Sequence, residues 1–224
     1  MLKARQVLAD QVFEAVLSLL LDGEISTGSA LSIDGLARRF DVSATPVREA
    51  LARLEATGMV RREALRGYKV APAPSASDVG ELLAARYLIE PEMASLACRN
   101  ASGDFVEELD RLNHTLDESR RGGDKFAGYR AYWTTDEIFH RRLAEGANNQ
   151  FLLRAYESIE GHIQRFRLLV HTEEMSGEHT VHEHQDIVEA IRAGDVSRAR
   201  EAMAAHIDGV RSRAAELHVF AGSE

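Results

Sequence analysis

Four side chains in the C-terminal part of the chain could together bind a metal ion. Asp136 and His140 lie four residues apart, so on a helix they project from adjacent turns of one face. His184 and His206 fall on the apolar faces of two further helical patterns. Burying a carboxylate and three imidazoles is costly unless each is paired, and a divalent ion pairs all four at once. The spacing leaves one alternative open, in which each histidine makes a core hydrogen bond and Asp136 is salt-linked elsewhere.

Such an ion would have a nitrogen-rich, borderline ligand set, which favours a divalent transition metal such as zinc or nickel over magnesium or calcium. At five or six coordination, a small organic or sugar acid could chelate the ion as an effector. Arg86 fits this idea because it lies on an apolar stripe, where a guanidinium needs an anion. Glu90, one turn further on, is the alternative partner. Tyr132 and His162 are further candidates to line an effector cavity.

The segments that carry these residues are all expected to be helical. Apolar residues recur there at three- and four-residue intervals, and no segment alternates as a strand does. The pattern predicts six antiparallel helices, over residues 78–99, 104–121, 125–145, 149–171, 177–192 and 195–218. Residues 78–224 should therefore form an all-α bundle. Because this bundle carries the candidate metal and effector residues, we expect it to bind the effector, and we also assign dimerisation to it. A linker over residues 72–77 contains Pro72 and Pro74, which disfavour helix, and Ser77 is the expected cap of the first helix.

Composition and charge set limits on the function. Residues 1–75 carry a net charge of +1 and the remainder −10, although eight basic residues between Arg38 and Lys69 face only four acidic ones. The single cysteine, Cys98, excludes an intramolecular disulfide framework and a zinc ribbon, and we assign it to helix packing. No window approaches the roughly 20 apolar residues that a membrane-spanning helix needs. We therefore expect a cytoplasmic protein with no membrane segment.

Residues 32–57 contain two short helical patterns joined by a tight turn, which is typical of a helix-turn-helix. Ser32 and Ser43 are the expected helix caps. Residues 59–63 and 67–70 predict the two strands of a hairpin that would form a wing. The predicted fold is therefore mainly α, with a winged helix-turn-helix and its small β wing over residues 1–71, followed by the antiparallel all-α bundle.

The second helix of such a motif can enter the major groove of double-stranded operator DNA. Because one such helix covers only a half-site, a homodimer is expected. Short polar side chains at the start of that helix suit phosphates or base edges, and the arginines around it suit the phosphate backbone. The expected DNA-contacting residues are Arg38, Arg39, Ser43, Ala44, Thr45, Arg48, Arg53, Arg66 and Gly67. The alternative is that these are solvated surface charges of an ordinary small helical domain.

Residues 5–72, and above all TPVREAL at 45–51, resemble the winged helix-turn-helix of the GntR family of bacterial transcription regulators. Many relatives carry Arg where this chain has Ala44, which implies a different operator. DEIFHRRLA at 136–144, EHQDIVEAIRAGD at 183–195 and AMAAHI at 202–207 resemble the all-helical ligand-sensing domain of the FadR-type branch. Members with an Asp/His/His/His set bind a divalent metal there. The resemblance assigns Asp136, His140, His184 and His206 to those positions.

The resemblance implies a ligand-responsive regulator, most commonly a repressor, of a metabolic operon. The residues themselves do not give the sign of regulation. Two alternatives remain, a metal-dependent enzyme that uses the His3Asp site and a direct metal sensor. Against the enzyme stand the attached DNA-binding domain and the lack of a clearly placed general base, because Glu183 points about 100° away from its neighbour His184 around the helix. We therefore expect a regulator without catalytic residues.

Overall fold

The protein divides into two compact units, Met1–Ala73 and Pro74–Glu224. The structure, a computed structural model, describes residues 2–63, 67–120, 126–169 and 177–216. Each unit buries its own set of apolar side chains. Across the described ranges, no helix combines the length and apolar character needed to cross a membrane.

Within residues 2–63 and 67–73 the N-terminal unit has three helices, α1 (Leu2–Leu21), α2 (Ile33–Phe40) and α3 (Ala44–Ala56). α2 and α3 form the predicted helix-turn-helix. The Ser32 Oγ accepts a hydrogen bond from the Gly35 amide at 3.1 Å, which confirms the predicted cap. Asp41 then adopts the left-handed conformation, with φ 53°, and this turns the chain between the two helices. The apolar face of α3, which includes the fully buried Val47 and Leu51, packs against α1.

A small antiparallel sheet completes this unit. β2 (Val60–Glu63) and β3 (Gly67–Val70) pair with Val60 opposite Val70, which confirms the predicted hairpin. A third strand, β1 (Ala30–Leu31), pairs with the other edge of β3 and gives the order β1-β3-β2. Its two residues are too few to produce a strand pattern in the sequence. Because β1 directly precedes the Ser32 cap, it attaches the wing to the helix-turn-helix.

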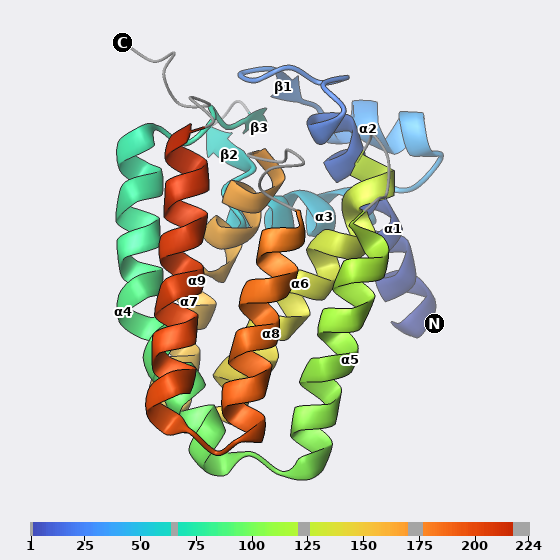
Figure 1. The fold of residues 1–224 in the computed structure, drawn as a ribbon. Coiled ribbons are helices and arrows are strands. Elements are labelled where there is room, and N and C mark those ends of the chain that lie inside the picture. Colours follow the sequence, from blue (N-terminus) through green and yellow to red (C-terminus); the bar gives the residue numbers. More distant parts are fainter. Residues whose placement is uncertain (1, 64–66, 121–125, 170–176, 217–224) are drawn as a thin grey trace. The chain divides into compact units, whose positions relative to one another are not determined.

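The C-terminal unit is an all-helical bundle, as predicted. In its described residues the helices are α4 (Ala76–Asn100), α5 (Gly103–Ser119), α6 (Phe126–Gly146), α7 (Gln150–Leu169), α8 (Glu178–Arg192) and α9 (Val196–Glu216). α4, α9, α8 and α5 lie side by side at the front of this unit, with α6 and α7 behind them (Figure 1). A buried cluster that includes Cys98, Leu143, Ile187 and Met203 joins α4, α6, α8 and α9, and it confirms the packing role assigned to the cysteine.

α4 begins earlier than the sequence predicted. Its cap is Ser75, not Ser77, and the helix therefore takes in the last residues of the linker predicted over 72–77. The Ser75 Oγ accepts a hydrogen bond from the Asp78 amide at 3.1 Å, and the Asp78 carboxylate accepts one from the Ser75 amide at 2.8 Å. This reciprocal capping box satisfies two helix-terminal donors, which Ser77 does not do at its own position.

The capping box gives a stability prediction. Replacing Ser75→Ala should lower the free energy of unfolding of the helical unit by about 1 kcal/mol, because it removes the side-chain cap. Ser77→Ala is the matched control and should cost less than about 0.5 kcal/mol at this exposed position. Urea unfolding followed by the fluorescence of Trp133, the single tryptophan, reports on this unit. Equal losses in the two variants would contradict the cap assignment.

Candidate functional site

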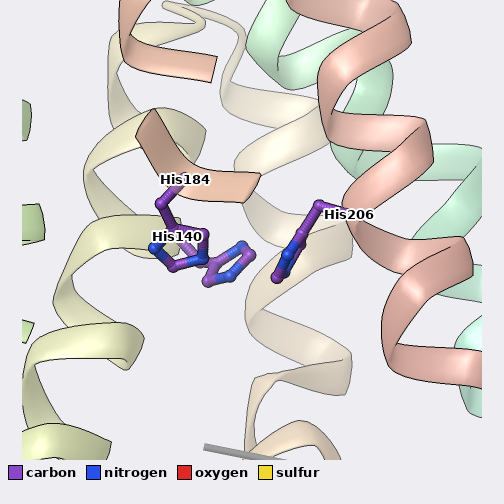
Figure 2. A group of neighbouring side chains, drawn as sticks. All are labelled: His140, His184 and His206. Atoms are coloured by element: carbon purple, nitrogen blue, oxygen red, sulfur yellow. The ribbon is translucent and has the colours of Figure 1, made fainter. Parts of the chain in front are cut away.

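Three histidines from three helices meet inside the C-terminal unit. His140 on α6, His184 on α8 and His206 on α9 are each at most 2% exposed. One ring nitrogen from each lies within 4.8 Å of those of the other two. The three rings converge on a common point (Figure 2). The structure therefore brings together three of the four side chains that the sequence predicted as metal ligands.

Asp136, the fourth predicted ligand, borders the same point. It is buried on α6, one turn before His140. Its Oδ1 lies 3.5 Å from the Nε2 of His184 and 3.8 Å from the Nε2 of His140. All four predicted residues thus belong to one buried cluster.

The second ring nitrogen of His140 faces a buried carboxylate. Its Nδ1 lies 2.7 Å from the Oε2 of Glu90, which α4 supplies and which is fully buried. Glu90 in turn accepts hydrogen bonds from Arg86, to Oε1 from Nε at 2.6 Å and to Oε2 from Nη2 at 3.3 Å. The buried guanidinium of Arg86 therefore has Glu90 as its partner, which is the alternative that the sequence left open.

His206 has a corresponding partner on the other side of the cluster. Its Nδ1 lies 2.8 Å from the Oε2 of Glu183 on α8. Arg213 of α9 holds both oxygens of this carboxylate, with Nη1 2.6 Å from Oε1 and Nη2 2.8 Å from Oε2. Because Glu183 lies about 100° from His184 around the helix, the sequence analysis did not include Glu183 in the site. A signal for Glu183 is present on α9, where Arg213 lies seven residues after His206 on the same face. One carboxylate from a neighbouring helix can contact both side chains there.

The ring of His184 is positioned by an aromatic neighbour. Phe139 of α6 stacks on it, with ring centroids 4.1 Å apart and an interplanar angle of 8°. Phe139 is fully buried and also belongs to the apolar core of the bundle. Apolar packing therefore contributes to the orientation of the His184 imidazole, whereas the Nδ1 atoms of His140 and His206 face carboxylates.

The two carboxylates are ionised despite their burial. Burial acts to raise the pKa of Glu90, but the charge of Arg86 and the hydrogen bonds from His140 and Arg86 outweigh it and hold this pKa well below its usual range. Burial also opposes ionisation of Glu183, yet hydrogen bonds from His206 and Arg213 lower its pKa to about 2. An ionised carboxylate can only accept hydrogen bonds, so the Nδ1 atoms of His140 and His206 are the donors. In the neutral rings the lone pair is then on Nε2.

The donor set is compatible with a metal ion. Three imidazoles and a carboxylate are ligands that zinc and other late transition ions accept, with bonds of about 2.0–2.2 Å. Neighbouring ligands of a tetrahedral ion with such bonds lie about 3.3 Å apart. The three histidine nitrogens, which lie within 4.8 Å of one another, would therefore move closer together around an ion. Burial also suits an ion, because it keeps bulk water from competing for the nitrogens. The chemistry of the cluster is therefore compatible with a metal site.

The residues predicted to bind an effector do not form one group. Arg86 is joined to the histidine cluster through Glu90. Tyr132 is buried on α6, one turn before Asp136, and so lies on the face of α6 that carries the cluster. His162 is exposed instead, in a cavity of about 280 Å³ that is also lined by Asp78, Arg165 and Phe166.

Most residues predicted to contact DNA lie on the surface of the N-terminal unit. Ser43, Thr45, Arg38 and Arg48 are exposed, and Ala44, the first residue of α3, is half-buried. Ser43 occupies the cap position of α3 without a side-chain cap bond in the structure. Its hydroxyl is therefore not committed to capping.

The remaining DNA candidates have protein neighbours or special geometry. Arg39 pairs with Glu24 at 2.8 Å, and Arg53 pairs with Asp10 at 2.6 Å and lies over the Phe13 ring. Both ion pairs are about half exposed, where such pairs contribute little to stability and can exchange for phosphates. Gly67 begins β3 with φ 83°, a left-handed conformation that favours glycine. Arg66 lies outside the described residues.

Comparison with known proteins matches both units to families. Residues 8–70 match the bacterial regulatory proteins of the gntR family, and residues 81–209 match the FCD domain. An HTH-type transcriptional regulator in an unstable DNA locus of Streptomyces ambofaciens is 32% identical over 91% of this chain and 85% of its own. The "Probable D-xylose utilization operon transcriptional repressor" of Paenarthrobacter nicotinovorans is 26% identical over 91% and 87%.

The fold also matches solved structures. A GntR transcriptional regulator from Rhodococcus sp. RHA1 superposes with a TM-score of 0.69 at 21% identity, over 96% of this chain and 99% of that one. These families consist of transcriptional regulators and not of enzymes, so the enzyme alternative is set aside. The chain belongs to the GntR family of bacterial transcriptional regulators, with a GntR helix-turn-helix domain followed by an FCD ligand-sensing domain.

Proposed function

We propose that this protein is a homodimeric repressor of a metabolic operon, acting in the bacterial cytoplasm, whose FCD domain binds a divalent transition metal and a small carboxylate effector. The observation that carries the proposal is the convergence of Asp136, His140, His184 and His206 at one buried point. Such a cluster has no role in DNA binding itself, and it lies in the domain that senses ligands in this family. The D-xylose operon repressor among the relatives supports the assignment as a repressor.

Each of the four residues would supply one ligand atom to the ion. His140 and His206 offer Nε2, because their Nδ1 atoms face Glu90 and Glu183. His184 offers a ring nitrogen beside Asp136. This nitrogen-rich set favours zinc or nickel. When bound, the ion supplies coordination positions that a carboxylate can occupy, and Tyr132 lies on the adjacent turn of α6.

The effector would bind with different affinity to the state of the dimer that can bind DNA and to the state that cannot. This difference would couple effector binding to operator affinity. Arg86 and Arg213, whose carboxylate partners face His140 and His206, are held by Glu90 and Glu183. An acid therefore gains most from the ion itself and from Tyr132.

DNA binding and dimerisation rest on two exposed surfaces. In the N-terminal unit, α3 presents Thr45 and Arg48 for the major groove. In the C-terminal unit, Leu88 of α4 is 79% exposed and Phe151 of α7 is 72% exposed, on helices that pack together. Exposed large apolar side chains on neighbouring helices support a contact with a second copy of the chain.

Operator binding tests the role of Arg48 on α3. Arg48→Ala should weaken binding to an operator duplex, selected from a random library with the wild-type protein, by at least about tenfold, because one base-edge or phosphate contact is worth about 1–3 kcal/mol. Arg198→Ala, an exposed arginine of the FCD domain, removes the same charge and should leave affinity within about twofold. Fluorescence anisotropy at several salt concentrations measures both, and wild-type affinity should fall steeply with salt. Equal affinity of the Arg48 variant and wild type would contradict the assignment of α3 as the recognition helix.

The metal content of the purified protein tests the proposed ligands. Purified wild type should contain close to one equivalent of zinc or nickel per chain, and His140→Ala and His206→Ala should each lose most of it, because each removes one ligand. His114→Ala, at an exposed histidine of α5, is the matched control and should keep the metal. Elemental analysis measures the content. Wild type that holds no metal even after reconstitution would overturn the metal part of the proposal and leave the DNA-binding part standing.

The effector is tested on the metal-loaded protein. A thermal-shift screen of small organic and sugar acids should show stabilisation by one class of acid, because a ligand that binds only the folded state raises its apparent stability. The same acids should stabilise His206→Ala less. If zinc or nickel alone changes operator affinity severalfold and no acid has an effect, the protein is a direct metal sensor and the effector proposal is wrong.

A further inference from the structure

Two arginine–glutamate pairs lie behind two of the histidines of the cluster. Arg86 and Glu90 face the Nδ1 of His140, and Arg213 and Glu183 face the Nδ1 of His206. The first pair comes from one helix, α4, whereas the second joins α8 to α9. The two sets of contacts are therefore built independently but end in the same way, with a carboxylate oxygen 2.7–2.8 Å from Nδ1.

We propose that these pairs are positioning devices that fix the Nδ1–H tautomer and ring plane of His140 and His206, so that both present Nε2 to the metal before it binds. A neutral imidazole carries its proton on one nitrogen, and the acceptor opposite Nδ1 decides which one. Each carboxylate is bound by the histidine on one side and by an arginine on the other, and the arginine holds it in place. An ionised carboxylate can only accept hydrogen bonds, so the histidine Nδ1 is the donor. Because this inference rests on the proposed metal site, it deepens that proposal.

Gly209 on α9 supplies an independent observation. A Cβ at this position would overlap Glu183 Oε1 and come within 3.0 Å of Arg213 Nη1. Glycine in a helix interior costs about 1 kcal/mol relative to alanine. Here the missing side chain leaves the space that the Glu183 carboxylate occupies. His206, Gly209 and Arg213 therefore form one surface of α9 that receives Glu183.

The bundle offers a matched control for this glycine. Gly80 is also inside a helix, α4, but a Cβ there would meet no atom within 4 Å. Gly80→Ala should therefore gain or keep stability through helix propensity, with no effect on the histidines. Gly209→Ala has the same propensity gain but displaces the carboxylate of Glu183. A difference between the two variants thus isolates the positioning role.

The experiment measures zinc affinity by competition with a chromophoric chelator in wild type, Glu183→Ala, Gly209→Ala and Gly80→Ala. None of these changes replaces a proposed ligand. We expect Glu183→Ala and Gly209→Ala to bind zinc about 10–100-fold more weakly than wild type, the usual cost of losing a group that orients a metal-bound histidine. Gly80→Ala should match wild type.

Nitrogen-15 NMR of histidine-labelled, metal-free protein supplies a readout that a loss of stability alone would not move. In wild type, His140 and His206 should both carry the proton on Nδ1. In Glu183→Ala and Gly209→Ala, His206 should become a mixture of tautomers, while His140 stays unchanged because Glu90 is untouched. His140 is thus the internal control for correct folding.

The outcomes separate the two proposals. If wild type binds zinc and Glu183→Ala and Gly209→Ala bind it equally well, with the His206 tautomer unchanged, the positioning role is wrong and the metal site stands. If wild type binds neither zinc nor nickel, the metal site is wrong and this inference falls with it. Should Gly209→Ala fail to fold, Glu183→Ala, which introduces no overlap, decides the question.

Discussion

Complete pairing of buried ionisable groups is the constraint on which the helical unit depends. Glu90 and Arg86 are almost wholly inaccessible to water, and so are the three histidines. Removing one member of a buried pair leaves an uncompensated charge, which costs about 3–5 kcal/mol. α4, α6, α8 and α9 must therefore come together in the one arrangement that gives each group its partner. The polar cluster specifies this arrangement more than it adds to stability.

The apolar core and the polar cluster are not separate layers. Phe139 belongs to the core formed with Leu143 and Ile187, and its ring also stacks on His184. Its neighbour in sequence, His140, points into the cluster instead. One helical turn of α6 thus contributes to both, so a change in core packing at Phe139 reaches the cluster without crossing any loop. Close-packed interiors transmit such strain because they contain few voids.

Periodicity in the sequence was enough to predict the bundle and to single out the four clustered residues, whereas their assignment to metal positions came from the family resemblance. The helices were recognised because their apolar residues repeat over many turns, and their limits were found to within a few residues. The four clustered residues were found because polar side chains on apolar stripes are rare. β1 was not predicted because its two residues are too few to show the alternation that is typical of a strand. Ser77 was chosen as a cap because the sequence does not show which serine meets Asp78 in space.

Partnerships across helices were the part that the sequence could not supply. The partner of Arg86 was left open between an external anion and Glu90, since spacing alone fits both. Glu183 was placed correctly relative to His184, but a helical wheel describes one helix and contains no information about its neighbour. What brings Glu183 into the site is the close approach of α9 at Gly209. Only the packed structure reveals that contact.

α4 also has a mechanical consequence. It runs without interruption from Ala76, three residues after the N-terminal unit ends, to Glu90 beside His140. At 1.5 Å per residue these points are about 21 Å apart along a stiff rod. A tilt of about 3° about the buried end would displace the first turn by about 1 Å. In this geometry a small tilt beside the histidines would correspond to a larger displacement at the end of α4 that is nearest to the linker.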